Sequence, residues 1–245
     1  MFQYAYARNL SILNQDTFYL DTSFYNNQVG VTPRVFSLNS FPQTLVNLDI
    51  PPIHNINVIN DTFKYDPAKL PKGNSLLQGY WQSEKYFKNS KDIIINDFSP
   101  DERSQKKLVK KYPHVTGISI SLHIRRTDYL TSNGYHPIQT IDYYKKAIDI
   151  LGEYENIFIF SDDIEWCKNN LSFNNMIFVE GNSDIEDLWL MSLCKKNIIV
   201  NSSFSWWGAY LNKNISKDVV APFKWFGDGV ALSVEDIVPQ KWNKI

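Results

Sequence analysis

Two adjacent arginines, Arg125 and Arg126, are the residues of this sequence whose type and position best suit chemistry on an anion. They lie near the end of the stretch 117–128, GISISLHIRRTD, in which apolar residues alternate with serine, histidine and arginine. This period of two predicts a strand with one face in a core and a second face that carries donors, His123 among them. Guanidinium groups bind phosphate oxygens two at a time. Two solvated arginines on an edge strand are the simpler alternative, but an unpaired buried guanidinium is costly, so we expect an anion here.

Further polar residues follow later predicted strands, at 161–163 (Ser, Asp, Asp) and at 201–204 (Asn, Ser, Ser, Phe). The segments that follow parallel strands open on one edge of the sheet, so these residues can converge with the arginines. Ser202 and Ser203 also open the helix-like segment SFSWWGAYL, and a helix N-terminus offers amides and a positive dipole end to a diphosphate. Taken alone, Ser202 is more simply an N-cap. Taken together, these positions resemble a nucleotide pocket.

Several carboxylates in this half of the chain have helix-related interpretations. Asp162 with Glu165, and Ser183 with Glu186, have the spacing of capping boxes, so we assign Asp162 mainly to the start of its helix. Asp187 differs, because it lies one turn inside the next helix among apolar residues. A carboxylate there can accept the N1 and N2 donors of guanine, and a surface-facing side chain is the alternative.

The elements that must position these residues alternate regularly in the second half of the chain. Strands separated by helices of about ten residues indicate right-handed crossovers and a Rossmann-like parallel sheet. We predict strands at 118–125, 156–160, 176–180, 197–200 and 218–221, and helices at 141–151, 163–170, 184–195 and 203–212.

The first half is less regular. We predict a helix at 1–13, strands at 17–20, 56–59 and 75–81, a helical segment at 82–87 and a charged helix at 100–112 that Pro113 ends. A domain junction is expected near this charged helix.

Composition limits the function classes. The 25 basic and 26 acidic residues give a formal charge of -1, which argues against nucleic acid as the main partner. Aromatic residues reach 15%, a content that suits sugar or base binding but equally a core. No apolar run has the length of a membrane span, and the two separate cysteines predict neither a disulfide framework nor a thiolate metal site. The sequence also has no GxxxxGK, GxGxxG, HExxH or DxD motif, so a metal-held nucleotide sugar is not expected.

Four blocks carry a resemblance to a known family. HIRRTDY at 123–129 resembles the HxRRxD motif of α-1,2-, α-1,6- and protein O-fucosyltransferases. Three longer blocks are similar to those of the bacterial α-1,2-fucosyltransferases: LQGYWQSEKYF, FSDDIEWCKNNL and DLWLMSLCKKNIIVNSSFSWWGAYLN. The similarity runs from Met1 to about Trp225.

The resemblance implies a GT-B-like α/β fold of two Rossmann-like lobes with parallel sheets. An N-terminal acceptor lobe, incomplete at its start, would span residues 1–115, and a GDP-fucose-binding lobe residues 116–245. Such an enzyme moves L-fucose from GDP-β-L-fucose to the 2-hydroxyl of a galactoside in a surface glycan, with inversion and with neither metal nor cofactor. It would act in the cytoplasm, at the inner face of the membrane if a lipid-linked acceptor provides peripheral contact.

The resemblance also assigns roles to residues. Arg125 and Arg126 would hold the pyrophosphate, and Arg125 would help to expel it. The guanine would contact His123 and Asp187, and the phosphate end would be closed by the segment of Ser202, Ser203 and Phe204.

Inverting transfer benefits from a base near the acceptor hydroxyl. The candidates are Asp128, for which we favour the role of holding an arginine, and His136, which is alternatively an ordinary loop residue.

Members of this family begin with a strand and a GGLGNQ-like loop that leads into MFQYAYA, whereas the printed sequence starts at that methionine. Two alternatives to transfer of fucose therefore stay open. One is a remnant that binds GDP or a nucleotide sugar without transfer, and the other is a glycosyltransferase that uses a different donor.

Overall fold

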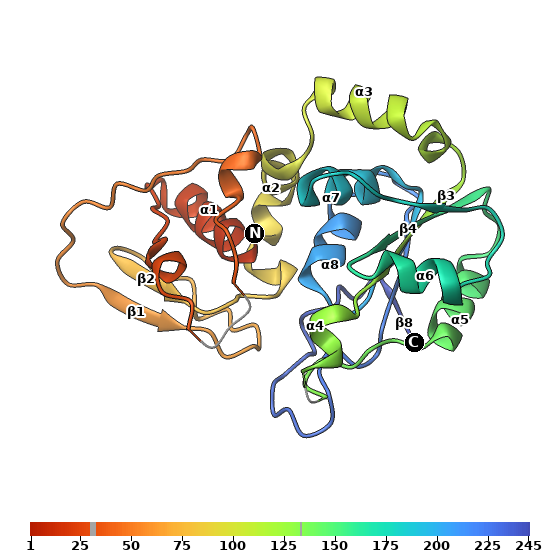
Figure 1. The fold of residues 1–245 in the computed structure, drawn as a ribbon. Coiled ribbons are helices and arrows are strands. Elements are labelled where there is room, and N and C mark those ends of the chain that lie inside the picture. Colours follow the sequence, from red (N-terminus) through yellow and green to blue (C-terminus); the bar gives the residue numbers. More distant parts are fainter. Residues whose placement is uncertain (30–32, 133) are drawn as a thin grey trace. The chain divides into compact units, whose positions relative to one another are not determined.

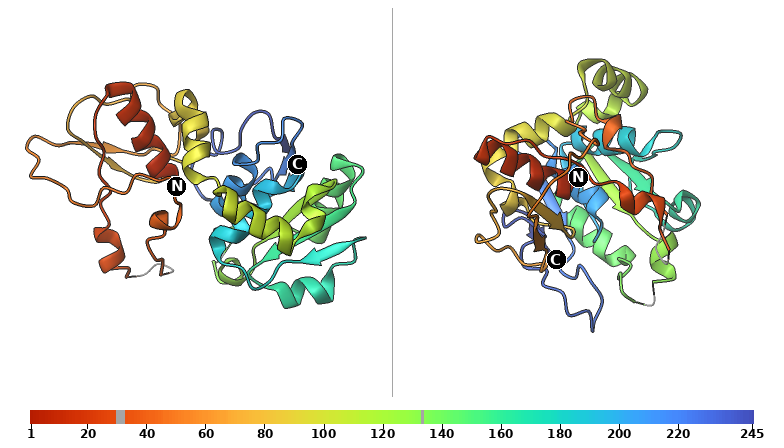
Figure 2. Two further views of the ribbon diagram at one scale, coloured as in Figure 1. Left: turned by 90° about the horizontal axis from the view of Figure 1, so that it is seen from above. Right: turned by 90° about the vertical axis from the view of Figure 1, so that its left-hand side faces the viewer.

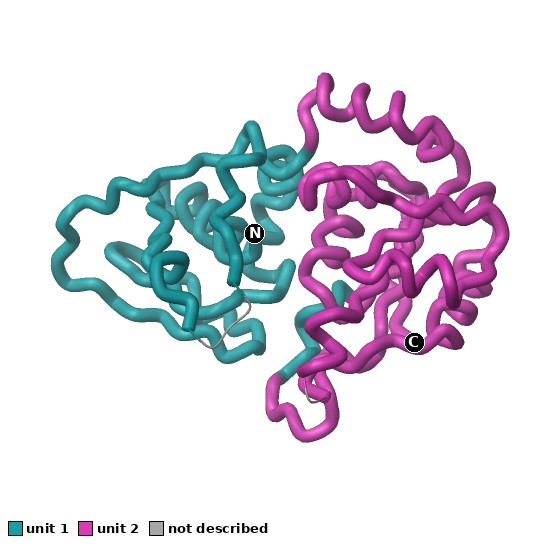
Figure 3. Tube along the Cα trace, in the orientation of Figure 1, with its two compact units in different colours: residues 1–99, 233–239 teal, residues 100–232, 240–245 magenta. Residues whose placement is uncertain are grey.

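Residues 1–29, 33–132 and 134–245 are described by the structure, a computed structural model. The chain divides into two units (Figure 3). Unit 1 consists of Met1–Ser99 and Ser233–Pro239, and unit 2 of Pro100–Leu232 and Gln240–Ile245. The sequence had placed the boundary at 115/116. The charged helix belongs to unit 2 because Lys107 on that helix pairs with Glu186 at 2.7 Å.

Unit 1 contains a two-stranded parallel sheet in which Asn57 pairs with Ser75 and Asn60 with Gln78. The predicted strand at 17–20 is wrong, because this segment is irregular and Leu20 makes only an isolated backbone bond to Asn47, at 2.8 Å. The described elements of this unit are α1 (Phe2–Asn14), β1 (Asn57–Asn60), β2 (Ser75–Gln78), α2 (Lys91–Phe98) and the 3₁₀ helices Ser23–Asn26, Leu38–Ser40, Glu84–Tyr86 and Lys88–Ser90.

Unit 2 is built on a six-stranded sheet, order β5-β4-β3-β6-β7-β8, in which every neighbouring pair is parallel (Figure 1). Its strands are β3 (Ser119–Ile124), β4 (Asn156–Ser161), β5 (Met176–Phe178), β6 (Lys196–Ile198), β7 (Asp218–Ala221) and β8 (Asn243–Lys244). Its helices are α3 (Glu102–Lys111), the 3₁₀ helix Pro113–Thr116, α4 (Thr127–Leu130), α5 (Ile141–Leu151), α6 (Ile164–Asn170), α7 (Asp184–Leu193) and α8 (Ser203–Tyr210).

The α/β prediction with parallel sheets is confirmed. In the described part of the chain, no helix combines the length and the apolar character of a transmembrane segment.

Helices cover both faces of this sheet (Figure 2). On one face, Ile120, Leu122 and Ile124 of β3 share a cluster with residues of α5 and α6. On the other face, Phe158 and Phe160 of β4 pack with residues of α7. The prediction that only one face of β3 is in a core was therefore wrong: all six residues of the strand are buried, because a parallel sheet with crossovers on both sides exposes neither face.

The two serines on the second face of β3, Ser119 and Ser121, have hydrogen-bond partners within the fold. The Asn197 Nδ2 of β6 donates to the Ser121 Oγ at 2.6 Å and to the Met191 carbonyl at 2.9 Å. Asn212 donates in turn to the Asn197 Oδ1 at 2.8 Å. These bonds join β3, β6, α7 and the end of α8 beneath the edge where the candidate residues lie.

Close packing of α7 on α8 depends on Gly208, since a Cβ at this position would lie 2.8 Å from the Met191 Cβ and Sδ. We expect Gly208→Ala to lower the free energy of unfolding by about 1–3 kcal/mol, because the added methyl group forces the two helices apart. Urea unfolding followed by circular dichroism measures this change. Unchanged or increased stability would show that Met191 adapts and that the close approach is not required.

Candidate functional site

The ends of β3 and β6 lie side by side, because the two strands are parallel neighbours with Ile120 opposite Lys196 and Leu122 opposite Ile198. The segment after β3 also contacts the segment after β6, since the Tyr129 hydroxyl donates to the Asn201 carbonyl at 2.7 Å. The arginine segment and the start of α8 thus lie at one edge of the sheet.

Arg125 is clamped by carboxylates at this edge. Its Nε and Nη2 donate to the two oxygens of Asp128 at 2.9 and 2.8 Å, and its Nε lies 3.2 Å from the Asp162 Oδ2. The side chain is 25% exposed, and its guanidinium lies 6.0 Å from the centre of the Tyr129 ring. The clamp that we favoured for Asp128 is therefore present, and the guanidinium stays partly accessible.

Arg126 has different surroundings. Its guanidinium lies 3.8 Å from the centre of the Trp166 ring of α6, and its Nε pairs with Asp163 at 3.1 Å. This stacking attaches the end of β3 to α6. The sequence predicted that both guanidiniums bind one anion. In the structure each guanidinium has its own partners.

Asp162 binds the backbone that follows β3, a role that the sequence did not predict. One of its oxygens accepts from the Arg126 amide at 2.9 Å, and the other accepts from the amide of Thr127 at 3.1 Å and from its hydroxyl. The predicted capping box was wrong, because the N-cap of α6 is Asp163, whose side chain accepts from the Trp166 amide at 3.2 Å. The sequence does show two consecutive aspartates after a strand, but it does not tell which of them caps the helix.

The N-terminus of α8 lies at the same edge of the sheet. Ser202 is the N-cap by backbone geometry, yet its side chain makes no capping hydrogen bond. Ser203 and Phe204 form the first turn, and the Phe204 ring lies 5.6 Å from the ring of His123 at the end of β3. His123, Ser202, Ser203 and Phe204 are thus brought together with Arg125 at this edge.

His123 is a neutral imidazole in the fold. It is 4% exposed, and burial followed by the charge of Arg125 lowers its pKa to about 3. Among the described residues its Nδ1 has no hydrogen-bond partner. A neutral buried ring of this kind offers one donor and one acceptor to a ligand.

The His136 ring lies in an aromatic stack. Its ring is parallel to the Tyr129 ring, with centroids 4.7 Å apart and an angle of 15°, and it meets Tyr135 edge-on at 4.7 Å. Burial lowers the pKa of His136, against a weaker opposite effect of Asp128. The Tyr129 ring contacts both His136 and the Arg125 guanidinium. The structure therefore places His136 one ring away from Arg125.

Asp187 lies in the first turn of α7, after a confirmed capping box between Ser183 and Glu186. Its Oδ1 accepts from the Asn182 amide group at 2.8 Å. Burial raises the pKa of Asp187 to about 6, although the bond from Asn182 lowers it. The Asp187 carboxylate is thus partly desolvated, and Asn182 binds one of its two oxygens.

Comparisons with known proteins cover all of these residues. The model of a family described as Glycosyl transferase family 11 matches residues 58–245. The chain is 39% identical over 186 residues to the Alpha-1,2-colitosyltransferase of Escherichia coli, covering 71% of this chain and 63% of that protein. It is 38% identical over 171 residues to the O-antigen biosynthesis glycosyltransferase WbnK of Escherichia coli, covering 63% of this chain and 56% of that protein.

A more distant relative is the Galactoside 2-alpha-L-fucosyltransferase of Caenorhabditis elegans, 26% identical over 68% of this chain and 51% of that protein. The chain therefore spans less than two thirds of the length of these curated relatives. Among solved structures, NodZ alpha-1,6-fucosyltransferase soaked with GDP-fucose aligns over 45% of this chain and 42% of that chain, with 17% identity and a TM-score of 0.34, too low to support a conclusion.

The bonds of Asp162 lead to a prediction on stability. Asp162→Asn replaces one acceptor oxygen by an amide that faces donors, so we expect the free energy of unfolding to fall by about 1–3 kcal/mol. Amide hydrogen exchange at Arg126 and Thr127 should accelerate as well. Glu165→Gln is the matched control: its side chain is 73% exposed and pairs with Lys168, so we expect a change within about 0.5 kcal/mol. A larger loss in the control than in Asp162→Asn would restore the capping-box interpretation.

The pKa of Asp187 leads to a second prediction. Because the folded-state pKa is raised to about 6, the contribution of the neutral carboxyl is fully present below about pH 4 and is lost as the pH rises through 6. We expect Asp187→Asn, which stays neutral, to be more stable than the wild type by about 1–2 kcal/mol at pH 8 and by much less at pH 4. Thermal unfolding at both pH values measures this. Equal effects at the two pH values would mean that the carboxyl is not desolvated.

Proposed function

Because this chain belongs to glycosyl transferase family 11, whose model matches residues 58–245, we propose that it transfers L-fucose from GDP-β-L-fucose to the 2-hydroxyl of a galactoside in a surface glycan. The transfer proceeds with inversion and without a metal ion. The observation that carries the proposal is the position of Arg125 and of the α8 N-terminus at the adjoining ends of β3 and β6. Such an edge suits a leaving diphosphate, because both groups stabilise negative charge that grows during the reaction.

The acceptor oxygen bonds to C1 of fucose from the face opposite the diphosphate, the C1–O bond to the diphosphate breaks, and its electron pair leaves with GDP. Arg125 and the amides at Ser203 and Phe204 would neutralise that charge. Arg126 contributes by keeping the end of β3 attached to α6.

The proton of the acceptor hydroxyl needs a base, and Asp128 and His136 remain the two candidates. Both oxygens of Asp128 are bound to Arg125, so a diphosphate that takes over this guanidinium would release the carboxylate beside the reacting groups. A lowered pKa favours the neutral form of His136, which can accept a proton, but its ring stacks on the far side of the Tyr129 ring. Proximity to Arg125 favours Asp128.

The guanine of the donor nucleotide would be bound by His123 and Asp187. A carboxylate accepts the N1 and N2 donors of guanine together, and a neutral His123 adds one donor or acceptor. The proposal includes action in the cytoplasm, at the inner face of the membrane, where a lipid-linked acceptor would provide peripheral contact.

Colitose is a second candidate for the transferred sugar, because the chain is 39% identical to a protein named as a colitosyltransferase. Assays of GDP-fucose and of the corresponding colitose donor with lactose-type acceptors distinguish the two. GDP binding without any transfer would support the remnant alternative, and preference for UDP- or ADP-sugars would contradict the proposal.

Loss of the Arg125 guanidinium gives the direct test. We expect Arg125→Ala to lower the turnover number at least about 100-fold and to weaken GDP binding, because the leaving charge loses its main partner. Arg125→Lys keeps the charge without the fork and should recover only part of the rate. Arg103→Ala, at an exposed position on α3, is the control. Calorimetric GDP affinity that is unchanged in Arg125→Ala would contradict the proposed site.

A further inference from the structure

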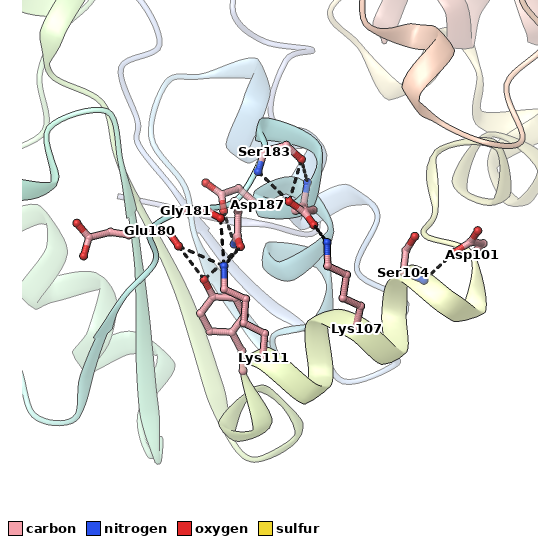
Figure 4. A network of polar contacts seen from close by, with 11 residues as sticks. Asp101, Ser104, Lys107, Lys111, Glu180, Gly181, Ser183 and Asp187 are labelled. Carbon is pink, nitrogen blue, oxygen red and sulfur yellow. Dashed lines mark hydrogen bonds and ion pairs between the residues drawn. The ribbon is translucent and has the colours of Figure 1, made fainter.

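The loop between β5 and α7 and the first turn of α7 are attached to α3 by two lysines that lie one helical turn apart (Figure 4). Lys107 pairs with Glu186 at 2.7 Å, which holds the first turn of α7. Lys111 donates to the Asn182 Oδ1 and to the carbonyls of Glu180 and Gly181, at 3.3 and 3.2 Å. The two lysines therefore attach α3 to different parts of the same connection.

The bonds of Asn182 fix the orientation of its amide. Its Oδ1 accepts from Lys111 and, at 3.3 Å, from the Tyr112 hydroxyl. A flipped amide would point its NH₂ group at the Lys111 ammonium, which can only donate. Its Nδ2 must therefore face Asp187, where it donates to the Oδ1 at 2.8 Å.

This bond leaves one oxygen of Asp187 for a ligand. No hydrogen bond to the Asp187 Oδ2 is found among the described residues, and the Oδ1 keeps further acceptor capacity. The chain Lys111, Asn182, Asp187 thus starts at an exposed helix and ends at a carboxylate whose plane is set by a fixed donor.

We propose that Lys111 and Asn182 are specificity-determining positioning residues that orient Asp187 toward a base edge with two adjacent N–H donors, as in guanine. This inference rests on the proposed function, because it assumes a guanine nucleotide as the donor's leaving group. Neither residue touches the base, and both act through the Asp187 carboxylate.

The chemistry of related bases makes the inference testable. Hypoxanthine keeps the N1 donor of guanine but lacks the N2 amino group. A carboxylate held in the plane of the base accepts hydrogen bonds from both N–H donors of the GDP base, but from only one N–H donor of the IDP base. When the carboxylate can rotate, the second bond is lost more often, and the preference for GDP over IDP decreases.

The experiment measures GDP and IDP affinities by calorimetry for the wild type, Lys111→Met and Asn182→Ala. We expect each variant to lose about 3- to 10-fold in GDP affinity and less in IDP affinity, so that the preference for GDP falls at least about 3-fold. Lys111→Arg retains a donor at this position and should keep most of the preference. Lys107→Met is the matched control, because it removes the neighbouring attachment of α3 without touching Asn182.

The outcomes separate the two proposals. A wild type that does not bind GDP would overturn the proposed function, and this inference with it. A wild type that prefers GDP, with the same preference in Lys111→Met and Asn182→Ala, would overturn this inference alone. An equal loss of preference in Lys107→Met would overturn it too, since docking of α3 would then be the only requirement.

Discussion

The pairing of β3 with β6 is the constraint on which the candidate site depends. These strands are consecutive neighbours in the sheet but are separated in sequence by the whole run from α4 to α7. Their parallel register places the residues after Ile124 beside the residues after Ile198. Backbone hydrogen bonds in a buried sheet are rigid, so the arginine segment and the start of α8 keep a fixed relation without direct contact between Arg125 and the helix.

The net charge at this edge of the sheet is not set by the arginines alone. Arg125 and Arg126 bring two positive charges, while Asp128, Asp162 and Asp163 bring three negative charges to the same contacts. For the proposed diphosphate, attraction would therefore have to arise from an exchange of partners at Arg125 and from the amides of α8, not from an excess of positive charge. Partly exposed ion pairs contribute only about 1 kcal/mol each, so Asp128 can give way to a doubly charged ligand at small cost.

The sequence predicted unit 2 more completely than unit 1, where α1, β1 and β2 were found but other elements were missed, for a physical reason. In unit 2 the predicted strands and helices each have a periodic pattern, and the five predicted strands from 118 onward are found within a few residues of their expected bounds. The short elements α4 and β8 were not predicted. In unit 1 the helix α2 was not predicted, because KDIIINDF has a short apolar run without a clear period. Its stability comes from distant partners, as when Asp97 accepts from the Tyr4 hydroxyl at 2.8 Å.

Local patterns were also insufficient within the site. The spacing of Asp162 and Glu165 is that of a capping box, but backbone geometry gave the cap to Asp163. Asp162 was then available to hold the amides of Arg126 and Thr127, a role that depends on β4 lying next to β3. Pairing between strands decides such roles, and a single sequence does not show it.

The different surroundings of the two arginines follow from the strand period itself. Residues 120, 122 and 124 of β3 face α5 and α6, while 121 and 123 face the side of α7 and α8. Extending this alternation by two residues puts Arg125 on the face of His123 and α8, and Arg126 on the face of α6, where Trp166 receives it. The two arginines at the end of this buried strand therefore face opposite sides: Arg125 lies on the side of the proposed ligand edge, and Arg126 attaches the end of the strand to α6.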